Sequence, residues 1–263
     1  NVAVMGAMDH SVWLGSSIFD GARAVAGRLP DLRLHLERAI RSADALGLVC
    51  PYDVDQLEAL CREGVARFPA DAELYIRPLI YGRDGLLVPT RSGFALTLFD
   101  APMPKFEGFS ACLSSMQRPS PNMAPTIAKA SCLYPNTTRA LVEAKQRGFD
   151  NAVVCDPIGN VAEFATANLF FVDQDDHIVT PVANGCFLSG ITRARVIQLL
   201  TTAGHTVHER SVRPQELMNA KELFNTGNYG KVIPCTRFED HHMPIGPIAQ
   251  LARRLYWEFM AQT

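Results

Sequence analysis

The sequence contains no apolar run long enough to span a bilayer, so no transmembrane helix is expected. The 263 residues carry a formal net charge of -2 and the basic residues are scattered, which argues against nucleic acid or an anionic membrane as a partner. Internal repeats and low-complexity segments are also missing. The seven cysteines are odd in number, widely spaced and without a Cys-x-x-Cys pair. This pattern predicts reduced thiols in a cytoplasm and no metal site.

The first ten residues lack the charged region and the cleavage site of a secretory signal, and they resemble the interior of a longer reading frame. A chain of this length buries roughly 70 to 75 per cent of its unfolded surface, enough for two domains. Two prolines and a glycine in residues 101–108 are typical of a linker. We therefore expect a small N-terminal α/β domain over residues 1–100 and a larger C-terminal domain over residues 109–263.

Hydrophobic periodicity predicts a mixture of helices and strands, and therefore an α+β (mixed α/β) fold. Helical spacing is found over residues 32–48, 53–68, 131–147, 187–200 and 247–262. Runs rich in β-branched and aromatic residues predict strands over residues 73–81, 93–100, 109–116, 151–156 and 161–172, and on both sides of the turn at 226–230. Asp53 is a plausible N-cap, and Pro135 is compatible with its helix only in the first turn.

Lys129 is the residue around which a functional hypothesis is best built. It lies among small and apolar neighbours in residues 124–134, with no carboxylate beside it in the sequence. Partial desolvation disfavours the charged form of a lysine and lowers its pKa, which favours attack of the free amine on a carbonyl. Schiff-base chemistry needs such an amine. The alternative is a half-buried lysine that extends its ammonium group to solvent.

Tyr75 and Arg77 stand two residues apart on a predicted strand and therefore share one face of it. A phenol hydroxyl beside a guanidinium forms a receptor for a carboxylate. The alternative is that Arg77 pairs with a structural Asp or Glu.

Glu163 and Arg41 are charged residues whose environments the sequence leaves open. Glu163 lies in a small, apolar run, where an acid has a dedicated cationic partner or is exposed on a loop. The predicted helix over residues 32–48 carries His35, Arg38 and Arg41 on its polar face. Taken alone, Arg41 is expected to be a solvated surface charge.

Two glycine turns are suited to bind phosphate. Gly190, Ile191 and Thr192 precede or open a helix, where unpaired backbone N–H groups lie at the positive end of the helix dipole. A plain N-cap is the alternative. The turn at residues 226–230 offers a second cluster of N–H donors. A desolvated lysine, a distant acid, an arginine on a helix and two such turns are the components of a pyridoxal 5'-phosphate site.

The order and the residues of these motifs resemble those of the class IV (fold-type IV) aminotransferases, the family of branched-chain and D-amino acid aminotransferases. The matching segments cover nearly the whole chain: residues 17–23, 35–41, 75–79, 114–118, 125–129, 159–163, 168–170, 190–193 and 226–227. The resemblance implies a smaller N-terminal α/β sandwich domain and a larger C-terminal pseudo-barrel domain. It also implies homodimers or larger homo-oligomers.

The resemblance assigns roles to individual residues. Lys129 matches the Schiff-base lysine, Glu163 the partner of the pyridine nitrogen, and Tyr134 the tyrosine that hydrogen-bonds the phenolic oxygen of the cofactor. The implied phosphate ligands are Arg41, Gly190, Ile191, Thr192, Gly227 and Asn228. Asn228 stands where the family usually has threonine. The implied substrate residues are Phe19, Gly21, Tyr75, Arg77 and Tyr229.

The Tyr-x-Arg-Pro strand resembles branched-chain enzymes, which implies ping-pong transfer between a branched-chain or related L-amino acid and a 2-oxo acid such as 2-oxoglutarate. Leu14 stands where that pattern has an aromatic residue, and the linker over residues 101–108 is short. The resemblance therefore leaves open which amino acid side chain the substrate pocket accepts. Alternatives on the same fold are a D-amino acid or (R)-amine transaminase and a 4-amino-4-deoxychorismate lyase. A scaffold that binds no cofactor is disfavoured, because Lys129 and Glu163 are both present.

Overall fold

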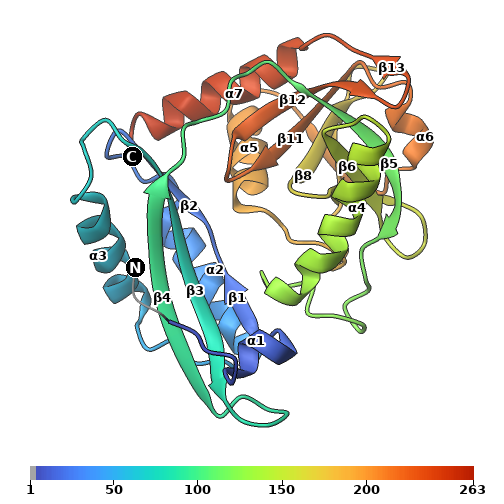
Figure 1. Ribbon diagram of the computed structural model, residues 1–263. Coiled ribbons are helices and arrows are strands. Elements are labelled where there is room, and N and C mark those ends of the chain that lie inside the picture. Colours follow the sequence, from blue (N-terminus) through green and yellow to red (C-terminus); the bar gives the residue numbers. More distant parts are fainter. Residues whose placement is uncertain (1–3) are drawn as a thin grey trace. The chain divides into compact units, whose positions relative to one another are not determined.

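The computed structural model describes residues 4–263, and the described chain divides into two compact units (Figure 1). Unit 1 comprises the chain up to Met103 together with Pro125–Tyr134 and Thr263, and unit 2 comprises Pro104–Ala124 and Pro135–Gln262. The first three residues of the stretch predicted to lack a secretory signal lie outside the described residues. The predicted domain boundaries at residues 100 and 109 stay a prediction.

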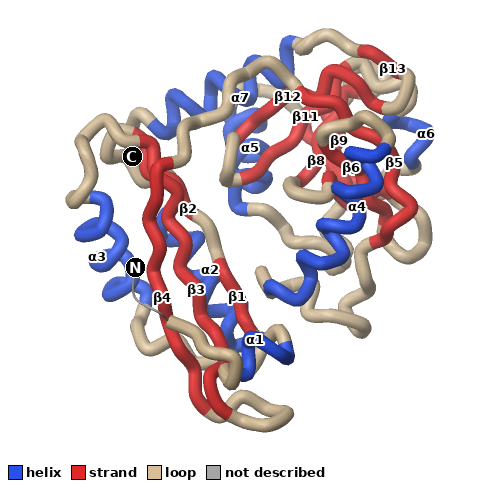
Figure 2. Tube along the Cα trace, viewed as in Figure 1, coloured by secondary structure: helices blue, strands red, loops and turns tan. Residues whose placement is uncertain are grey.

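Unit 1 contains a four-stranded antiparallel sheet and helices on one face of it. Its elements are α1 (His10–Leu14), β1 (Ser17–Phe19), β2 (Ala22–Val25), α2 (Leu32–Ala45), α3 (Val54–Val65), β3 (Glu73–Asp84), β4 (Arg91–Asp100) and the short 3-10 helix η1 (Ser131–Leu133). Strand β2 pairs with the first part of β3, and β1 pairs with a later part of it. Strand β4 pairs with β3 from Leu74 to Asp84. Figure 2 shows the long β3–β4 pair in red, with α2 and α3 in blue.

Alternation along β3 separates the core face from the opposite face of the sheet. Leu74 and Ile76 are buried against α2 and α3 in a common hydrophobic cluster. Tyr75 and Arg77 therefore lie on the other face, because successive strand residues point to opposite sides. The predicted cap of α3 is confirmed: Asp53 accepts the Gln56 N–H at 2.8 Å and the Gln56 side chain accepts the Asp53 N–H at 3.0 Å.

Unit 2 contains a nine-stranded mixed sheet. Its elements are β5 (Phe109–Gln117), α4 (Tyr134–Gln146, whose first residue belongs to unit 1), β6 (Asn151–Cys155), β7 (Val161–Phe164), β8 (Asn168–Val172), β9 (Ile178–Pro181), α5 (Ile191–Thr202), β10 (Val207–Arg210), α6 (Pro214–Leu217), β11 (Glu222–Gly227), β12 (Lys231–Phe238), β13 (His241–His242) and α7 (Pro247–Met260). The strand order is β10-β9-β8-β11-β12-β5-β6-β7, with β13 on β12.

The sheet of unit 2 curls around its own core. Side chains from seven of its strands, β5 to β9 with β11 and β12, form one buried cluster that includes Phe164, Phe171 and Phe238. Helices α5 and α7 cover another face through Val196, Tyr256 and their neighbours. This arrangement agrees with the C-terminal pseudo-barrel domain that the family resemblance implies. The structure divides the single strand predicted over residues 161–172 into β7 and β8.

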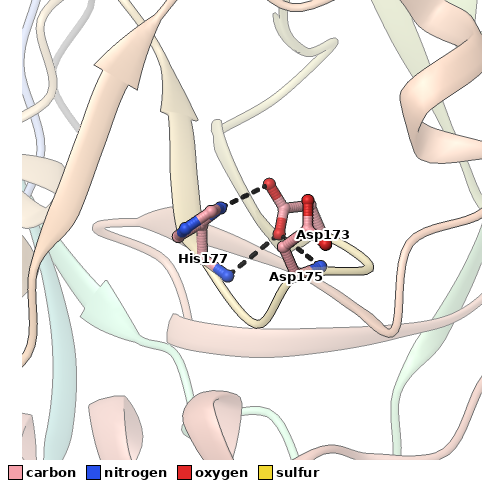
Figure 3. A group of neighbouring side chains, drawn as sticks. All are labelled: Asp173, Asp175 and His177. Carbon is pink, nitrogen blue, oxygen red and sulfur yellow. Dashed lines mark hydrogen bonds and ion pairs between the residues drawn. The ribbon is translucent and has the colours of Figure 1, made fainter.

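The turn between β8 and β9 is closed by a cluster of polar side chains (Figure 3). Oδ1 of Asp173 accepts the N–H groups of Asp175 and His177 at 3.0 and 2.9 Å, and Oδ2 lies 3.2 Å from Nδ1 of His177. One side-chain oxygen or nitrogen atom from each of the three residues lies within 4.8 Å of the other two. These hydrogen bonds account for the clustering, because they satisfy the backbone of the turn.

Two further properties bear on the predictions from composition. Within residues 4–263, no helix combines the length and the apolar character needed to cross a membrane. All seven cysteines are free thiols. Burial raises the pKa of Cys61 and of Cys235 to about 12, so these thiols stay protonated at neutral pH.

Candidate active site

The backbone of Lys129 is fixed by hydrogen bonds within unit 1. Its N–H donates to Oγ of Ser42 on α2 at 3.0 Å, and its carbonyl accepts the Phe19 N–H at 3.2 Å. The next residue, Ala130, forms an isolated antiparallel bridge with Ile18. The lysine is therefore attached to the end of β1, and its position is set by the sheet of unit 1.

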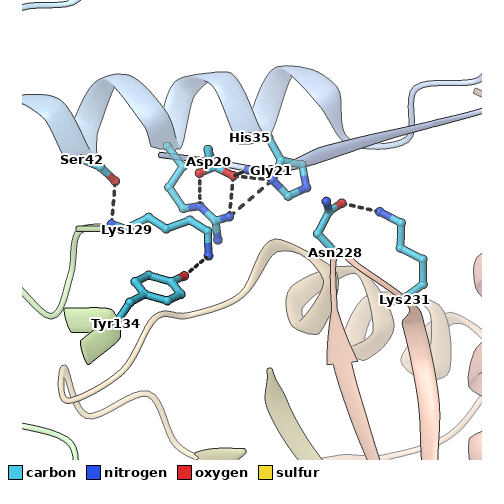
Figure 4. A network of polar contacts seen from close by, with 9 residues as sticks. Asp20, Gly21, His35, Ser42, Lys129, Tyr134, Asn228 and Lys231 are labelled. Carbon is cyan, nitrogen blue, oxygen red and sulfur yellow. Dashed lines mark hydrogen bonds and ion pairs between the residues drawn. The ribbon is translucent and has the colours of Figure 1, made fainter. Parts of the chain in front are cut away.

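The Lys129 side chain lies beside two aromatic rings, those of Phe19 and Tyr134, and Figure 4 shows its contact with Tyr134. Nζ donates to Oη of Tyr134 at 3.0 Å and lies 5.1 Å from the centroid of the Phe19 ring. The two rings are 4.9 Å apart and tilted by 50°. Both interactions restrict the side chain, so the amine has a defined position instead of extending freely into solvent.

A buried ion pair lies beside the lysine in unit 1. Asp20 occupies the break between β1 and β2 and is fully buried. Arg38 donates to both of its oxygens at 2.7 and 2.8 Å, and Nδ1 of His35 lies 2.9 Å from Oδ1. The expectation that His35 and Arg38 lie on a polar surface is wrong, because they turn inward to neutralise this acid. Burial raises the pKa of Asp20, but Arg38 and His35 lower it more and hold it well below the ordinary value.

The pKa of Lys129 lies above its ordinary value, so the expectation of a lowered pKa is wrong. Burial lowers this pKa, as the sequence suggests, and the Arg38 guanidinium lowers it further. Tyr134 and the Asp20 carboxylate raise it by more. Asp20 is distant in the sequence and is brought near by folding, so the sequence around Lys129 gave no sign of it. The amine is therefore protonated at neutral pH before it reacts.

Glu163 on β7 is a buried acid with two partners in unit 2. Oε1 lies 3.0 Å from Nε of Arg118, and Oε2 accepts from Nδ2 of Asn168 at 3.0 Å. Arg118 also donates to Oγ1 of Thr137 and to the carbonyl of Ala165. Of the two alternatives for this acid, the structure shows the dedicated cationic partner. An ionised carboxylate accepts several hydrogen bonds at once, so these contacts are compatible with a further N–H donor.

The start of α5 forms the second candidate surface in unit 2. Gly190 is its N-cap, and the Ala194 N–H donates to the Gly190 carbonyl. A Cβ on Gly190 would lie 2.0 Å from Oδ1 of Asn168, so only glycine fits here. Asn168 pairs in register with Thr226 of β11, which places the end of β11 near this helix start.

Three buried polar atoms in this region have no hydrogen-bond partner among residues 4–263: Oγ1 of Thr192, Oγ1 of Thr226 and Nδ2 of Asn228. Unpaired buried donors are costly, so they indicate a place where a polar ligand is bound. The amide nitrogen and the two hydroxyls can all donate, and together with the N–H groups at the start of α5 they provide a set of donors that suits an anion. The residues present in unit 2 are therefore suited to a phosphate group.

The family model described as amino-transferase class IV matches residues 17–238. The chain belongs to the class IV aminotransferases. It is 33% identical over 231 residues to a probable branched-chain-amino-acid aminotransferase from Rickettsia bellii, covering 86% of this chain and 79% of that protein.

Two solved structures extend the similarity to the whole fold. An aminotransferase from Brucella abortus bound to the cofactor PLP gives a TM-score of 0.97 with 44% identity, covering 99% of this chain and 95% of that chain. A branched-chain aminotransferase from Thermoproteus uzoniensis with norvaline gives a TM-score of 0.92 with 30% identity. This match covers 99% of this chain and 91% of that chain. The predicted fold and the predicted aminotransferase class are thereby confirmed.

The predicted substrate residues of this class IV aminotransferase include a cluster on β3 and its neighbours. A Cβ on Gly21 would lie 2.0 Å from Oη of Tyr75, so the phenol is packed directly over this glycine. Tyr75 stacks on Phe99 with centroids 5.6 Å apart, and the exposed Arg77 lies 5.5 Å from the same ring. Tyr229 is 59% exposed in the turn after β11. The substrate roles of these residues stay predictions.

The structure also identifies residues to which the sequence assigned no role: Arg38, Asp20, Arg118, Asn168, Thr226 and Lys231. All of these except Lys231 lie inside motifs that match the family, which was the available signal. Arg38 was overlooked because Arg41, a second arginine on the same helix, was assigned the role. Arg41 is exposed, whereas Arg38 is 12% exposed and its charge lowers the pKa of Lys129. No sequence signal marked Lys231, because most lysines are exposed.

Proposed function

We propose that this aminotransferase uses pyridoxal 5'-phosphate held by Lys129, and that it moves the amino group of a branched-chain or related L-amino acid to a 2-oxo acid such as 2-oxoglutarate. The observation that carries the cofactor assignment is the set of buried donors without partners at Thr192, Thr226 and Asn228. Donors at a helix start suit a phosphate monoester. The names of the Rickettsia and Thermoproteus relatives support the branched-chain donor.

The proposed cofactor ligands follow from the geometry of each unit. Tyr134, in contact with Nζ of Lys129, is proposed to donate to the phenolic oxygen. Glu163, paired with Arg118, is proposed to accept the N–H of the pyridinium ring. Backbone N–H groups of Ile191 and Gly227, near Gly190 and Asn228, are proposed to contact the phosphate. The bound cofactor supplies an electron sink for the carbanion that forms when the substrate loses its α-proton.

Lys129 is proposed to transfer that proton. A primary amine removes the α-proton when neutral and returns it when protonated, so one residue serves as base and acid in succession. Because the pKa of Lys129 is raised, its proton has to leave before the first transfer. The phenol of Tyr134 at 3.0 Å positions the amine for this exchange. The reaction proceeds in two halves, with the donor leaving as a 2-oxo acid before the acceptor enters.

Tyr75 and Arg77 are proposed to receive the substrate carboxylate, with Phe19, Gly21 and Tyr229 lining the site. Arg77 is exposed, and Tyr75 is held in place by Gly21 below it and Phe99 beside it. A guanidinium with a fixed phenol recognises a carboxylate by charge and hydrogen bonding.

For the phosphate, Arg38 is the better supported arginine. It is 12% exposed and its charge acts on Lys129, whereas Arg41 is exposed on the same helix. The role that the resemblance gives to Arg41 therefore stays a prediction, and we propose Arg38 as its competitor. Substitution of each arginine distinguishes them.

The central experiment is the first half-reaction with a panel of donors, read from the absorbance of the bound cofactor. We expect L-leucine to react, and D-alanine and an (R)-amine to be inert; a preference for either of these two would assign the D-amino acid or amine class instead. Release of pyruvate from aminodeoxychorismate without an acceptor would assign the lyase. Lys129→Ala should lose both turnover and cofactor absorbance, while Lys105→Ala on an exposed site should keep both.

We also propose a cytoplasmic location and a homodimer or larger homo-oligomer. The seven free cysteines support a reducing compartment. The oligomer follows from the family resemblance, and sedimentation of the purified protein tests it; a monomer over a wide concentration range would contradict it.

A further inference from the structure

The β11–β12 hairpin of unit 2 contains a fully buried lysine. Gly227 pairs with Lys231 across a three-residue loop, Asn228 to Gly230. Lys231 is 0% exposed and has a φ of 61°, in the left-handed region that hairpins of this kind usually fill with glycine. Burial of a cation and a left-handed backbone at a residue other than glycine both cost free energy. Their combination at Lys231 suggests that this lysine has a specific function.

The contact made by Lys231 fixes the orientation of an amide. Its Nζ donates to Oδ1 of Asn228 at 2.7 Å (Figure 4). An ammonium group has only donors, so the atom facing it must be the amide oxygen and cannot be the amide nitrogen. Nδ2 of Asn228 is thereby directed to the other side, where it is buried and without a hydrogen-bond partner among residues 4–263.

The neighbours of this amide present further donors. Thr226 is in the last turn-flanking part of β11, two residues before Asn228 in the sequence, and it pairs with Asn168 of β8. Asn168 in turn lies against Gly190 at the start of α5, where Thr192 follows. The hydroxyls of Thr192 and Thr226 are buried and also lack partners within the described chain.

We propose that Lys231 is a positioning residue that holds the Asn228 amide with its N–H₂ group toward the phosphate of the cofactor. The proposal rests on the proposed function. The family usually has a threonine at position 228, and a hydroxyl rotates to suit its ligand. An amide has a donor end and an acceptor end, and its oxygen would repel a phosphate. Asparagine serves at this position because a donor-only group occupies its oxygen.

The test uses Lys231→Gly, which removes the ammonium and suits the left-handed backbone. Apoprotein is titrated with pyridoxal phosphate and with pyridoxal, which lacks the phosphate, and binding is read from absorbance. We expect affinity for pyridoxal phosphate to fall about tenfold to a hundredfold, the effect of a hydrogen bond to a charged group, with affinity for pyridoxal unchanged. Lys221→Met removes a lysine of unit 2 outside the hairpin and should alter neither.

A second substitution makes the result specific to the amide. Asn228→Thr in the Lys231→Gly background should recover affinity for pyridoxal phosphate to within about threefold, since a hydroxyl needs no partner to orient it. A merely structural lysine predicts no such recovery. If Lys231→Gly does not fold, Asn228→Asp in the intact hairpin serves instead: it keeps the contact with Lys231, replaces the donor by an oxygen, and should lose at least a hundredfold in affinity for pyridoxal phosphate.

The proposal would be overturned if wild type and Lys231→Gly bound pyridoxal phosphate with equal affinity. It would also be overturned if Lys231→Gly lost affinity for pyridoxal by the same factor as for pyridoxal phosphate. Retained affinity in Asn228→Asp would overturn it in the same way. The proposed function fails on a different result: wild-type protein that binds pyridoxal phosphate no better than pyridoxal, or binds neither.

Discussion

Arg118 and Glu163 form an ion pair inside unit 2, with Nε of the arginine 3.0 Å from Oε1 of the glutamate and side chains 15% and 10% exposed. The pair places a cationic partner beside an acid that is buried in an apolar part of the sheet. The proposed contact of Glu163 with the ring nitrogen of the cofactor therefore depends on this arginine.

We expect Arg118→Met to lower the free energy of unfolding by about 3 to 5 kcal/mol, because it leaves a buried carboxylate without its partner. The loss is measured by urea unfolding at pH 7. Arg67→Met serves as the control, because it removes an exposed ion pair between Glu63 of α3 and an arginine just beyond the end of that helix, and it should leave stability nearly unchanged. Equal effects of the two substitutions would show that the Arg118 pair contributes nothing beyond a surface contact.

The buried Asp20 predicts a specific dependence on pH. Its pKa is well below the ordinary value of about 3.9, because Arg38 and His35 outweigh the effect of burial. The stability it contributes is fully present above that ordinary pKa and is lost as the pH falls through the folded-state pKa. Asp20→Asn should therefore cost about 3 to 5 kcal/mol at both pH 7 and pH 5.

Below about pH 4 the difference between wild type and Asp20→Asn should shrink, since the acid in the unfolded wild-type chain then becomes protonated. Urea unfolding of both proteins at pH 7, 5 and 3 measures this. A difference that shrinks already between pH 7 and 5 would contradict the assignment to Asp20.

Assigning the phosphate contact to Arg38 or to Arg41 leads to opposite predictions for cofactor binding. We expect Arg38→Lys, which keeps the charge but loses the two-pronged contact with Asp20, to weaken binding of pyridoxal phosphate about tenfold. Arg41→Lys should leave binding unchanged. Titration of the two apoproteins measures both constants; the reverse outcome would restore the phosphate role to Arg41.

Gly21 and Gly93 offer a matched pair of substitutions. In both, an added Cβ meets a tyrosine ring: Tyr75 above Gly21, with Oη at 2.0 Å, and Tyr81 above Gly93, with Cζ at 2.4 Å. Each alanine variant should lose about 1 to 3 kcal/mol of stability through overpacking. Only Gly21→Ala moves the proposed carboxylate receptor, and it should lower kcat/KM for the amino donor about tenfold to a hundredfold. Similar kinetic losses in both variants would assign the effect to stability alone.

Local patterns predicted the elements whose signals are local. The Asp53 cap was found because its sequence satisfies the geometry of a helix start, and Pro135 lies in the first turn of α4, where a missing N–H is harmless. The strand predicted over residues 161–172 divides at Ala165–Ala167, which no glycine or proline marks.

Of the candidate site, the residues with unusual surroundings were easiest to predict. Lys129 and Glu163 stand out because each is a charged residue in a small, apolar run. Their partners were not predictable in the same way. Asp20 and Arg118 reach them through folding, and neither pairing leaves a periodic trace in the sequence. Burial lowers the pKa of Lys129, as the sequence indicates, but the nearby Tyr134 and the distant Asp20 together raise it above its ordinary value.

The grouping of Pro125–Tyr134 with unit 1 affects how the protein is made on the ribosome. The bridge between Ile18 and Ala130 and the hydrogen bond from Phe19 to Lys129 join the start of the chain to a segment synthesised much later. Strand β1 of the nascent polypeptide therefore waits until residues 125–134 have been synthesised before these neighbours emerge from the exit tunnel. The amine at position 129 reaches its place only when this earlier-made strand completes its contacts.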